Sequence, residues 1–207
     1  MSDARGGKYR LAEALVRVVA RDGFAGVSMR AVATEAGVSG GTVQYYFPNR
    51  AEMIRFAMEW TSAQVEQRIS RISRWGEVDD WTREILLDLL PLSVERHREL
   101  AVWIAFVAHA ETDPALAGLK RQTNEKLRAL YTRIICARRG FPVHAEGSGS
   151  PGAEVENDAL LLQSFLDGLA LHLVDLEPQE AARVGPPLLD RYLALAVDTQ
   201  ATRNDRD

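Results

Sequence analysis

The segment Val27–Arg50, VSMRAVATEAGVSGGTVQYYFPNR, constrains the fold more than any other part of the chain. Ser28 can cap a helix, because its hydroxyl oxygen accepts a hydrogen bond from a free amide of the first helical turn. Gly37 is suited to end that helix, since glycine adopts a positive φ without strain. Ser39 can cap a second helix at once, and Pro48 ends it because proline has no amide hydrogen to donate. The segment therefore predicts two short helices joined by a tight turn.

The second of these helices has an outward face that suits nucleic-acid recognition. Its outward positions combine hydrogen-bonding and aromatic side chains: Thr42, Gln44, Tyr45 and Tyr46. Glutamine can pair with an adenine edge, threonine can contact a thymine methyl group, and tyrosine hydroxyls suit phosphate oxygens. Arg30 in the first helix and Arg50 beyond the second can flank such a reading head. The pattern favours a DNA-binding helix-turn-helix, and the alternative is a solvated helical hairpin with surface tyrosines.

The run from Phe24 to Met53, with AGVSGGTVQYYFPNRAEM at its centre, closely resembles the N-terminal domain of the TetR family of bacterial transcriptional regulators. The form VQYYFP, from Val43 to Pro48, looks most like the subgroup typified by the choline-responsive repressor BetI. The resemblance implies an all-α homodimer that places its reading helices in successive major grooves. One position departs from the family pattern, because Gly40 stands where relatives often carry a polar or basic residue.

The candidate DNA contacts fall into two groups. Four residues are candidates for contacts with base edges: Arg30, Thr42, Gln44 and Tyr45. The family resemblance implies five further contacts that position the phosphate backbone: Ser28, Ser39, Gly41, Tyr46 and Arg50. The glycine of the second group would act through its backbone amide. The implied partner is double-stranded DNA with a palindromic operator.

The charge of the chain is distributed unevenly. The net charge is −4 over 207 residues, but residues 1–60 contain eight Lys or Arg and six Asp or Glu, a balance of +2. The remainder of the chain therefore has a balance of −6. A mildly basic region on an acidic chain suits specific DNA binding better than indiscriminate coating of nucleic acid.

Several other classes of protein find no support in the sequence. No apolar run approaches the roughly 20 residues needed to cross a bilayer, and the start of the chain shows no cleavable signal. Cys136 is the single cysteine, so no internal disulfide can form, which suits a reducing cytoplasm. The four histidines are scattered, and no catalytic or phosphate-binding motif is present. We therefore expect no enzyme activity, no metal, no cofactor, no membrane association and a cytoplasmic location.

The rest of the chain has the three- and four-residue apolar spacing of amphipathic helices. Besides the two short helices, we expect helices at residues 8–21, 50–74, 78–92, 94–112, 114–139, 154–176 and 179–201, and a Gly-, Ser- and Pro-rich loop at 140–153. These patterns predict an all-α fold of two domains. Residues 1–50 form a three-helix helix-turn-helix DNA-binding domain, and residues 51–207 form a larger helical effector-binding and dimerisation domain.

The last two expected helices are the most apolar in the chain. A helix that is apolar around most of its circumference must be buried on more than one side. We interpret the pair as a dimer interface, in which each subunit contributes two helices to a four-helix bundle, and this matches the family. The candidate interface residues are Leu162, Phe165, Gly168, Leu169, Leu189, Tyr192 and Leu193. The alternative is a buried core hairpin in a monomer.

A small-molecule effector is implied chiefly by the family resemblance, since members bind one between helices of the larger domain and then bind DNA more weakly. The candidate pocket residues are Trp60, Trp103, Phe106, His109 and Phe165. An aromatic lining favours a cation such as a quaternary amine. The expected function is a homodimeric repressor released by an effector of unknown identity. Two alternatives stay open: a DNA-binding regulator without an effector, and a helical interaction module that does not bind DNA.

Overall fold

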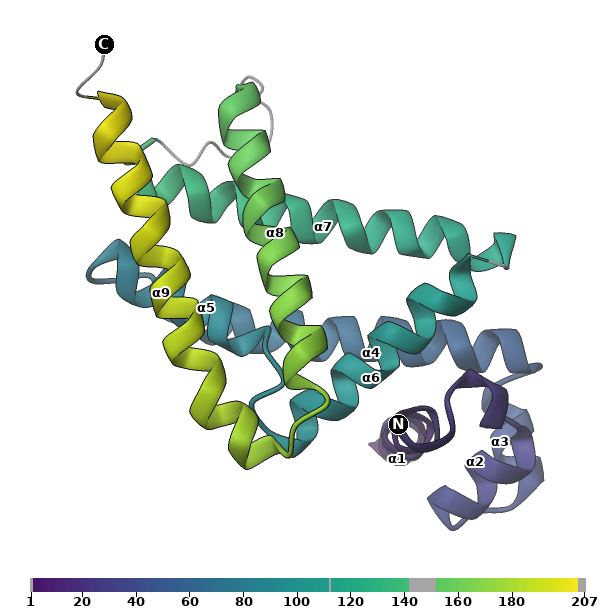
Figure 1. Cartoon of the computed structure of the whole chain (residues 1–207). Coiled ribbons are helices and arrows are strands. Elements are labelled where there is room, and N and C mark those ends of the chain that lie inside the picture. The colour runs from purple at the N-terminus through teal and green to yellow at the C-terminus, as the bar shows by residue number, and fades with distance from the viewer. Residues whose placement is uncertain (1, 112, 142–151, 205–207) are drawn as a thin grey trace. The chain divides into compact units, whose positions relative to one another are not determined.

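The computed structural model describes residues 2–111, 113–141 and 152–204, and all regular structure in these ranges is helical, as predicted (Figure 1). The elements are α1 (Ser2–Asp22), the 3-10 helix η1 (Phe24–Gly26), α2 (Met29–Ala36), α3 (Gly40–Tyr46), α4 (Arg50–Arg71), α5 (Val78–Asp88), α6 (Val94–Ala110), α7 (Pro114–Arg138), α8 (Ala153–Leu173) and α9 (Pro178–Asn204). Most of the loop expected at residues 140–153 lies outside the described ranges.

Several helix boundaries differ from the prediction by three residues or more, and the start of α1 and the end of α5 differ most. α1 begins at Ser2 rather than at residue 8, although Gly6 and Gly7 lower the intrinsic helix propensity of this stretch. α5 ends at Asp88 rather than at residue 92. Pro91 explains the early end of α5, because a proline disfavours the α conformation in the residue before it. The apolar spacing in the sequence continues past Asp88, so the spacing alone predicted a longer helix than the proline allows.

The chain forms two compact units that do not divide at residue 50. The first unit combines the chain up to Ser70 with His97–Ala129, and the second combines Arg71–Arg96 with the chain from Leu130 onward. The domain boundary expected at residue 50 therefore lies inside the first unit. The reason is that α4 and α6 share an apolar core with the helix-turn-helix helices. The division at residue 50 follows a sequence motif and stays a prediction.

The first unit is built around that shared core. Its buried side chains include Leu11, Leu15, Val18, Phe24, Val32, Val43, Phe47, Met53 and Ile54 from the helix-turn-helix region and α4, and Val102 and Phe106 from α6. α2 and α3 have only eight and seven residues, and helices of this length are not stable alone in water. Packing against α1 and α4 therefore supplies the stability of the two short helices.

In the second unit, α9 is held against two neighbouring segments. Arg83 on α5 donates hydrogen bonds of 2.5 and 2.9 Å to the two carboxylate oxygens of Asp190 on α9. A Cβ atom at Gly185 would come within 2.9 Å of side-chain atoms of Leu92 and Leu173. The missing side chain at Gly185 leaves room for the methyl groups of these two leucines, which would have to shift if alanine stood at this position.

Thr61 on α4 is buried and its hydroxyl makes no hydrogen bond to the residues that the structure describes. Thr61→Val replaces the hydroxyl by a methyl group of similar size and removes the unsatisfied polar atom, so we expect the free energy of unfolding to rise by about 1 kcal/mol. Thr82→Val is the matched control, because the equally buried Thr82 hydroxyl donates to the Val78 carbonyl at 2.7 Å. Thermal unfolding should show a gain for Thr61→Val and none for Thr82→Val, and a loss for Thr61→Val would contradict this argument.

Candidate nucleic-acid interface

The helix caps of α2 and α3 are confirmed by their hydrogen bonds. The Ser28 hydroxyl accepts a hydrogen bond of 3.1 Å from the Ala31 amide, and the Ser39 hydroxyl accepts one of 3.1 Å from the Thr42 amide. Gly37 has φ +65°, in the left-handed region that ends α2. The Ser28 hydroxyl keeps a hydrogen that it can donate elsewhere, and the Ser39 hydroxyl does so when Thr42 is the donor in the hydrogen bond between their hydroxyls. A phosphate contact by either serine is thus compatible with its role as a cap.

The outward face of α3 is exposed and has side chains with free hydrogen-bonding capacity. Thr42, Gln44 and Tyr45 are exposed, and 82% of the Tyr45 surface is accessible. The side chains of Gln44 on α3 and Arg30 on α2 make no hydrogen bond or ion pair within the described part of the chain. The Thr42 hydroxyl shares a hydrogen bond of 2.9 Å with the Ser39 hydroxyl. Arg30 and Gln44 are therefore free to bind an external partner.

Tyr46 does not share this outward orientation, and the structure corrects that part of the prediction. Its side chain is half-buried and packs against the core of the first unit. A Cβ atom at Gly7 would lie 2.8 Å from the Tyr46 hydroxyl oxygen, so the ring reaches α1. The helix expected to begin at residue 8 begins at Ser2 instead, so it extends past Gly7 and meets the ring. The phosphate contact expected of Tyr46 stays a prediction.

A cleft of about 460 Å³ lies between α2 and α3. We call it the α2–α3 cleft. It is lined by Met29, Arg30, Ala33, Thr34, Val38, Gly40 and Gln44. Two of the candidate base contacts, Arg30 and Gln44, thus line one cavity from different helices. No atom lies within 4 Å of the position that a Cβ atom would take at Gly40, so the missing side chain contributes to the open space.

Arg50, a candidate phosphate contact, is an exposed residue whose side chain makes hydrogen bonds within its own chain. Its Nε donates a hydrogen bond of 3.0 Å to the carbonyl of Val27, and its Nη2 donates to the carbonyl of Phe24. These carbonyls belong to η1 and to the residue that follows it. Arg50 therefore ties the start of α4 to the segment that leads into α2. Sequence reasoning identified the residue but missed this structural role.

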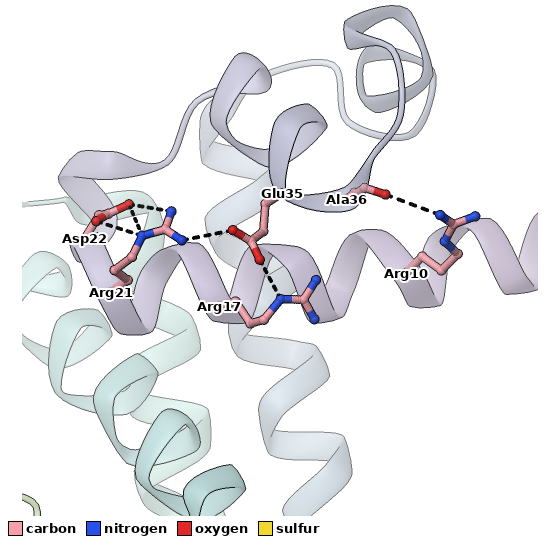
Figure 2. A network of polar contacts seen from close by, with 6 residues as sticks. All are labelled: Arg10, Arg17, Arg21, Asp22, Glu35 and Ala36. Carbon is pink, nitrogen blue, oxygen red and sulfur yellow. Dashed lines mark hydrogen bonds and ion pairs between the residues drawn. The ribbon is translucent and has the colours of Figure 1, made fainter.

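A network of arginines on α1 fixes the orientation of α2 (Figure 2). Arg17 Nε donates to one carboxylate oxygen of Glu35 at 2.7 Å, and Arg21 Nη1 donates to the other at 2.9 Å. Arg10 Nη2 donates to the carbonyl of Ala36, the last residue of α2, at 3.3 Å. The sequence analysis missed this network. The four-residue spacing of Arg17 and Arg21 could have indicated a shared face on α1.

Hydrogen bonds from Arg17 and then Arg21 lower the pKa of Glu35 below its ordinary value. A lowered pKa in the folded state means that the stabilisation is complete above the unfolded pKa, about 4.3, and is lost as pH falls through the folded pKa. We expect the free energy of unfolding of the wild type to fall below pH 4.3 more steeply than that of Glu35→Gln. The Arg17→Ala/Arg21→Ala variant should show the same shallower profile. Identical profiles for the wild type and Glu35→Gln would contradict this assignment.

Four of the expected effector-pocket residues take part in the packing of the first unit. Phe106 is fully buried, and its ring contacts that of Trp103 with centroids 5.9 Å apart. His109 contacts the ring of Phe24 at 5.8 Å, and Trp60 packs edge-on against Tyr9 at 4.5 Å. Phe165, the fifth, belongs to the second unit and stacks on Tyr192 at 3.9 Å. The role of these five residues in effector binding stays a prediction.

The seven residues expected at a dimer interface are only in part the ones that α8 and α9 expose, and their interface role stays a prediction. Four of them have at most 9% of their surface accessible and pack inside their own chain: Leu162, Leu169, Leu189 and Leu193. The exposed leucines of these helices are Leu160, Leu161, Leu171, Leu188 and Leu195, which we call the outer leucines. At Gly168 a Cβ atom would meet nothing within 4 Å, so this side of α8 is open. Apolar periodicity shows that both sides of a helix are apolar, but not which side its own chain covers.

No helix in the described ranges is long and apolar enough to span a membrane. The same ranges hold no group of three or more His, Cys, Asp or Glu side chains that could bind a metal ion.

Comparisons with known proteins identify the family of this chain. Residues 11–55 match the family described as bacterial regulatory proteins, tetR family, and residues 78–198 match the C-terminal family of BetI-type transcriptional repressors. The chain is 30% identical over 203 residues to the HTH-type transcriptional regulator PksA of Bacillus subtilis (strain 168), covering 97% of this chain and 92% of the relative.

Two solved structures have the same fold. A transcriptional regulator from Rhodococcus sp. Rha1 is 32% identical with a TM-score of 0.68, covering 87% of this chain and 94% of that one. A regulator from Saccharomonospora viridis, solved in complex with choline, is 18% identical with a TM-score of 0.77, covering 94% and 97%. The chain therefore belongs to the TetR family of bacterial transcriptional regulators, with a BetI-type C-terminal domain, and it is a DNA-binding regulator and not an enzyme.

Proposed function

We propose that this regulator is a cytoplasmic homodimeric repressor that binds a palindromic operator through α2 and α3 and is released by a small-molecule effector. The observation that carries the DNA-binding part is the free hydrogen-bonding capacity of Arg30 and Gln44 on the exposed side of a rigid helical pair. A fixed backbone scaffold limits the conformational entropy lost on binding to that of the side chains, and groups with no partner in their own chain have no internal hydrogen bond to break.

The DNA contacts divide into groups that read bases and groups that position the backbone. Arg30, Thr42, Gln44 and Tyr45 read base edges, because they lie on or beside the exposed face of α3. The remaining candidates contact phosphates: Ser28, Ser39, Gly41, Tyr46 and Arg50. Base contacts carry sequence discrimination, whereas phosphate contacts add affinity that does not depend on sequence.

Gln44→Ala tests the base-reading role. We expect the variant to lose about 1–3 kcal/mol of discrimination at one base pair of each half-site, because an amide that pairs with a base edge rejects the other bases by this amount. Fluorescence anisotropy on operator duplexes with single base-pair changes measures the discrimination. The variant should keep wild-type discrimination at every other position. A uniform loss of affinity across all operator variants would contradict a base-reading role for Gln44.

The homodimer is proposed to form through the outer leucines of α8 and α9. A single exposed leucine is common on protein surfaces. Five exposed leucines on two packed helices make an apolar surface whose exposure to water is unfavourable. Leu188 and Leu195 are seven residues apart on α9, the spacing that keeps side chains on one face of a helix packed against a partner. The open surface at Gly168 allows a partner helix to approach α8 closely.

A quaternary amine is the first effector class that we propose, since the C-terminal match is to BetI-type repressors and the regulator from Saccharomonospora viridis was solved with choline. The coupling between effector and operator is reciprocal and is typically about 1–3 kcal/mol, or about 5- to 150-fold in affinity. Choline added to the protein–operator complex should lower the anisotropy in a saturable way. Unchanged anisotropy at millimolar choline would exclude choline as the effector, and wider screening with the same assay would follow.

A further inference from the structure

The α2–α3 cleft has an apolar floor and a polar rim. Met29, Ala33 and Val38 supply the apolar surface, of which Ala33 is buried and the other two are half-buried. The rim consists of the exposed polar side chains Arg30, Thr34 and Gln44. The cleft therefore suits a ligand that presents one apolar group between hydrogen-bonding groups.

The charge around the cleft favours a negatively charged partner. None of the residues that line it is acidic, and Arg30 contributes a positive charge that no carboxylate of the described chain neutralises. Glu35 is the one acidic residue of α2, and it forms ion pairs with Arg17 and Arg21 on α1 instead (Figure 2). The network on α1 thus removes the carboxylate of α2 as a source of repulsion toward DNA.

Gly40 keeps the cleft open. It lies at the first position of α3 and lines the cleft beside Gln44, one helical turn away. A side chain at this position would meet no protein atom within 4 Å at its Cβ, so it would extend into space that is now empty. Packing within the described chain therefore does not require glycine at this position. The absence of a side chain at Gly40 instead affects the size of the group that the cleft can bind.

Resting on the proposed DNA-binding function, we propose that the α2–α3 cleft receives the methyl-bearing edge of one thymine in each half-site of the operator. The 5-methyl group of thymine is the apolar group that the major-groove edges of the four bases present, and hydrogen-bonding atoms surround it. Met29, Ala33 and Val38 contact the methyl group, while Arg30 and Gln44 bind neighbouring base edges. The cleft volume of about 460 Å³ has room for the edge of a base and not only for its methyl group.

Replacement of thymine by deoxyuridine tests the inference, because it removes the methyl group and leaves base pairing intact. Each thymine of an operator duplex is replaced in turn, and the dissociation constant is measured by fluorescence anisotropy at fixed salt. We expect one position in each half-site at which the wild type loses about fourfold in affinity, the value for one buried methyl-sized group, and at which Gly40→Leu loses nothing. Gly40→Leu fills the cleft and should bind the thymine and uracil duplexes equally.

Gly40→Ala is the matched control, since it adds the helix-favouring Cβ atom but leaves most of the cleft open. This variant should still lose about fourfold in affinity when the sensitive thymine is replaced by deoxyuridine. Met29→Ala widens the cleft instead of filling it and should reduce the loss, which provides a second test if Gly40→Leu binds no DNA. A Gly40→Leu variant that keeps the loss at every sensitive thymine would overturn the inference, because the methyl groups would then be contacted elsewhere. A wild type without any sensitive thymine would also overturn it. A wild type that binds no duplex selectively would overturn the proposed function and the inference with it.

Discussion

A Leu188→Asp variant is expected to be a monomer and to bind the operator about 100- to 10,000-fold more weakly than the wild type. Leu188 is 43% exposed on α9, and Leu195 follows one heptad later with 59% exposed. In a two-fold symmetric dimer each carboxylate would be desolvated in an apolar interface, which is strongly unfavourable. The affinity falls because a monomer binds only one half-site. In a dimer, binding of the first reading head holds the second at a high effective concentration near its own half-site.

Val94→Asp is the matched control for this variant. Val94 is 46% exposed, almost the same as Leu188, but lies at the start of α6. Sedimentation equilibrium should show a dimer for Val94→Asp and a monomer for Leu188→Asp, while circular dichroism should show both folded. A folded Leu188→Asp dimer with wild-type operator affinity would mean that the outer leucines are not the interface.

An Arg50→Ala variant is expected to be less stable and to bind every DNA sequence more weakly. Loss of the hydrogen bonds to the carbonyls of Phe24 and Val27 should lower the free energy of unfolding by about 1–3 kcal/mol. Loss of one phosphate contact should lower the slope of log K against log salt by about one. Urea unfolding and anisotropy titrations across a range of salt concentrations measure the two effects separately.

Arg30→Ala provides the contrast, because the Arg30 side chain has no partner within the described chain. This variant should keep wild-type stability and lose discrimination at one base pair. Arg50→Lys keeps the charge but cannot reach two carbonyls in the same geometry, so it should restore the salt slope more fully than the stability. An unchanged salt slope in Arg50→Ala would leave Arg50 with the structural role alone.

The helix-turn-helix could be predicted from the sequence because its determinants are local. Ser28, Gly37 and Ser39 each act on residues within four positions of themselves, and the structure has the caps and the turn where the sequence indicates them. The family match rests on the same short segment and its spacing. Local chemistry therefore predicted the elements of the candidate site and, except at Tyr46, the exposed face of α3.

What the sequence did not reveal depends on contacts between distant residues. Arg50 bonds to carbonyls more than 20 positions earlier, and Arg17 and Arg21 bond to Glu35 across two helices. The sequence alone does not show whether an arginine binds a group inside the fold or a group in DNA. Tyr46 was misplaced for a related reason, since its neighbour at Gly7 lies in a stretch of weak helix propensity.

The apolar helices α8 and α9 show a second limit. Their sequence predicted burial on two sides, but both sides carry leucines and periodicity does not distinguish them. Leu162 is buried in its own chain and the adjacent Leu161 is 62% exposed. A shift of one residue turns a helical side chain by about 100°, so the packing of the whole unit has to be known before an interface can be assigned.

The most direct test of the central claim is fluorescence anisotropy of the purified protein on duplexes that tile the DNA upstream of its own gene, at fixed near-physiological salt. We predict tight binding to one palindromic tile, with two chains per duplex and resistance to excess non-specific competitor DNA. Binding that is equally weak on all tiles and is removed by competitor would be followed by genome-wide selection of bound fragments. Failure of that selection to enrich any sequence would contradict a role in operator recognition.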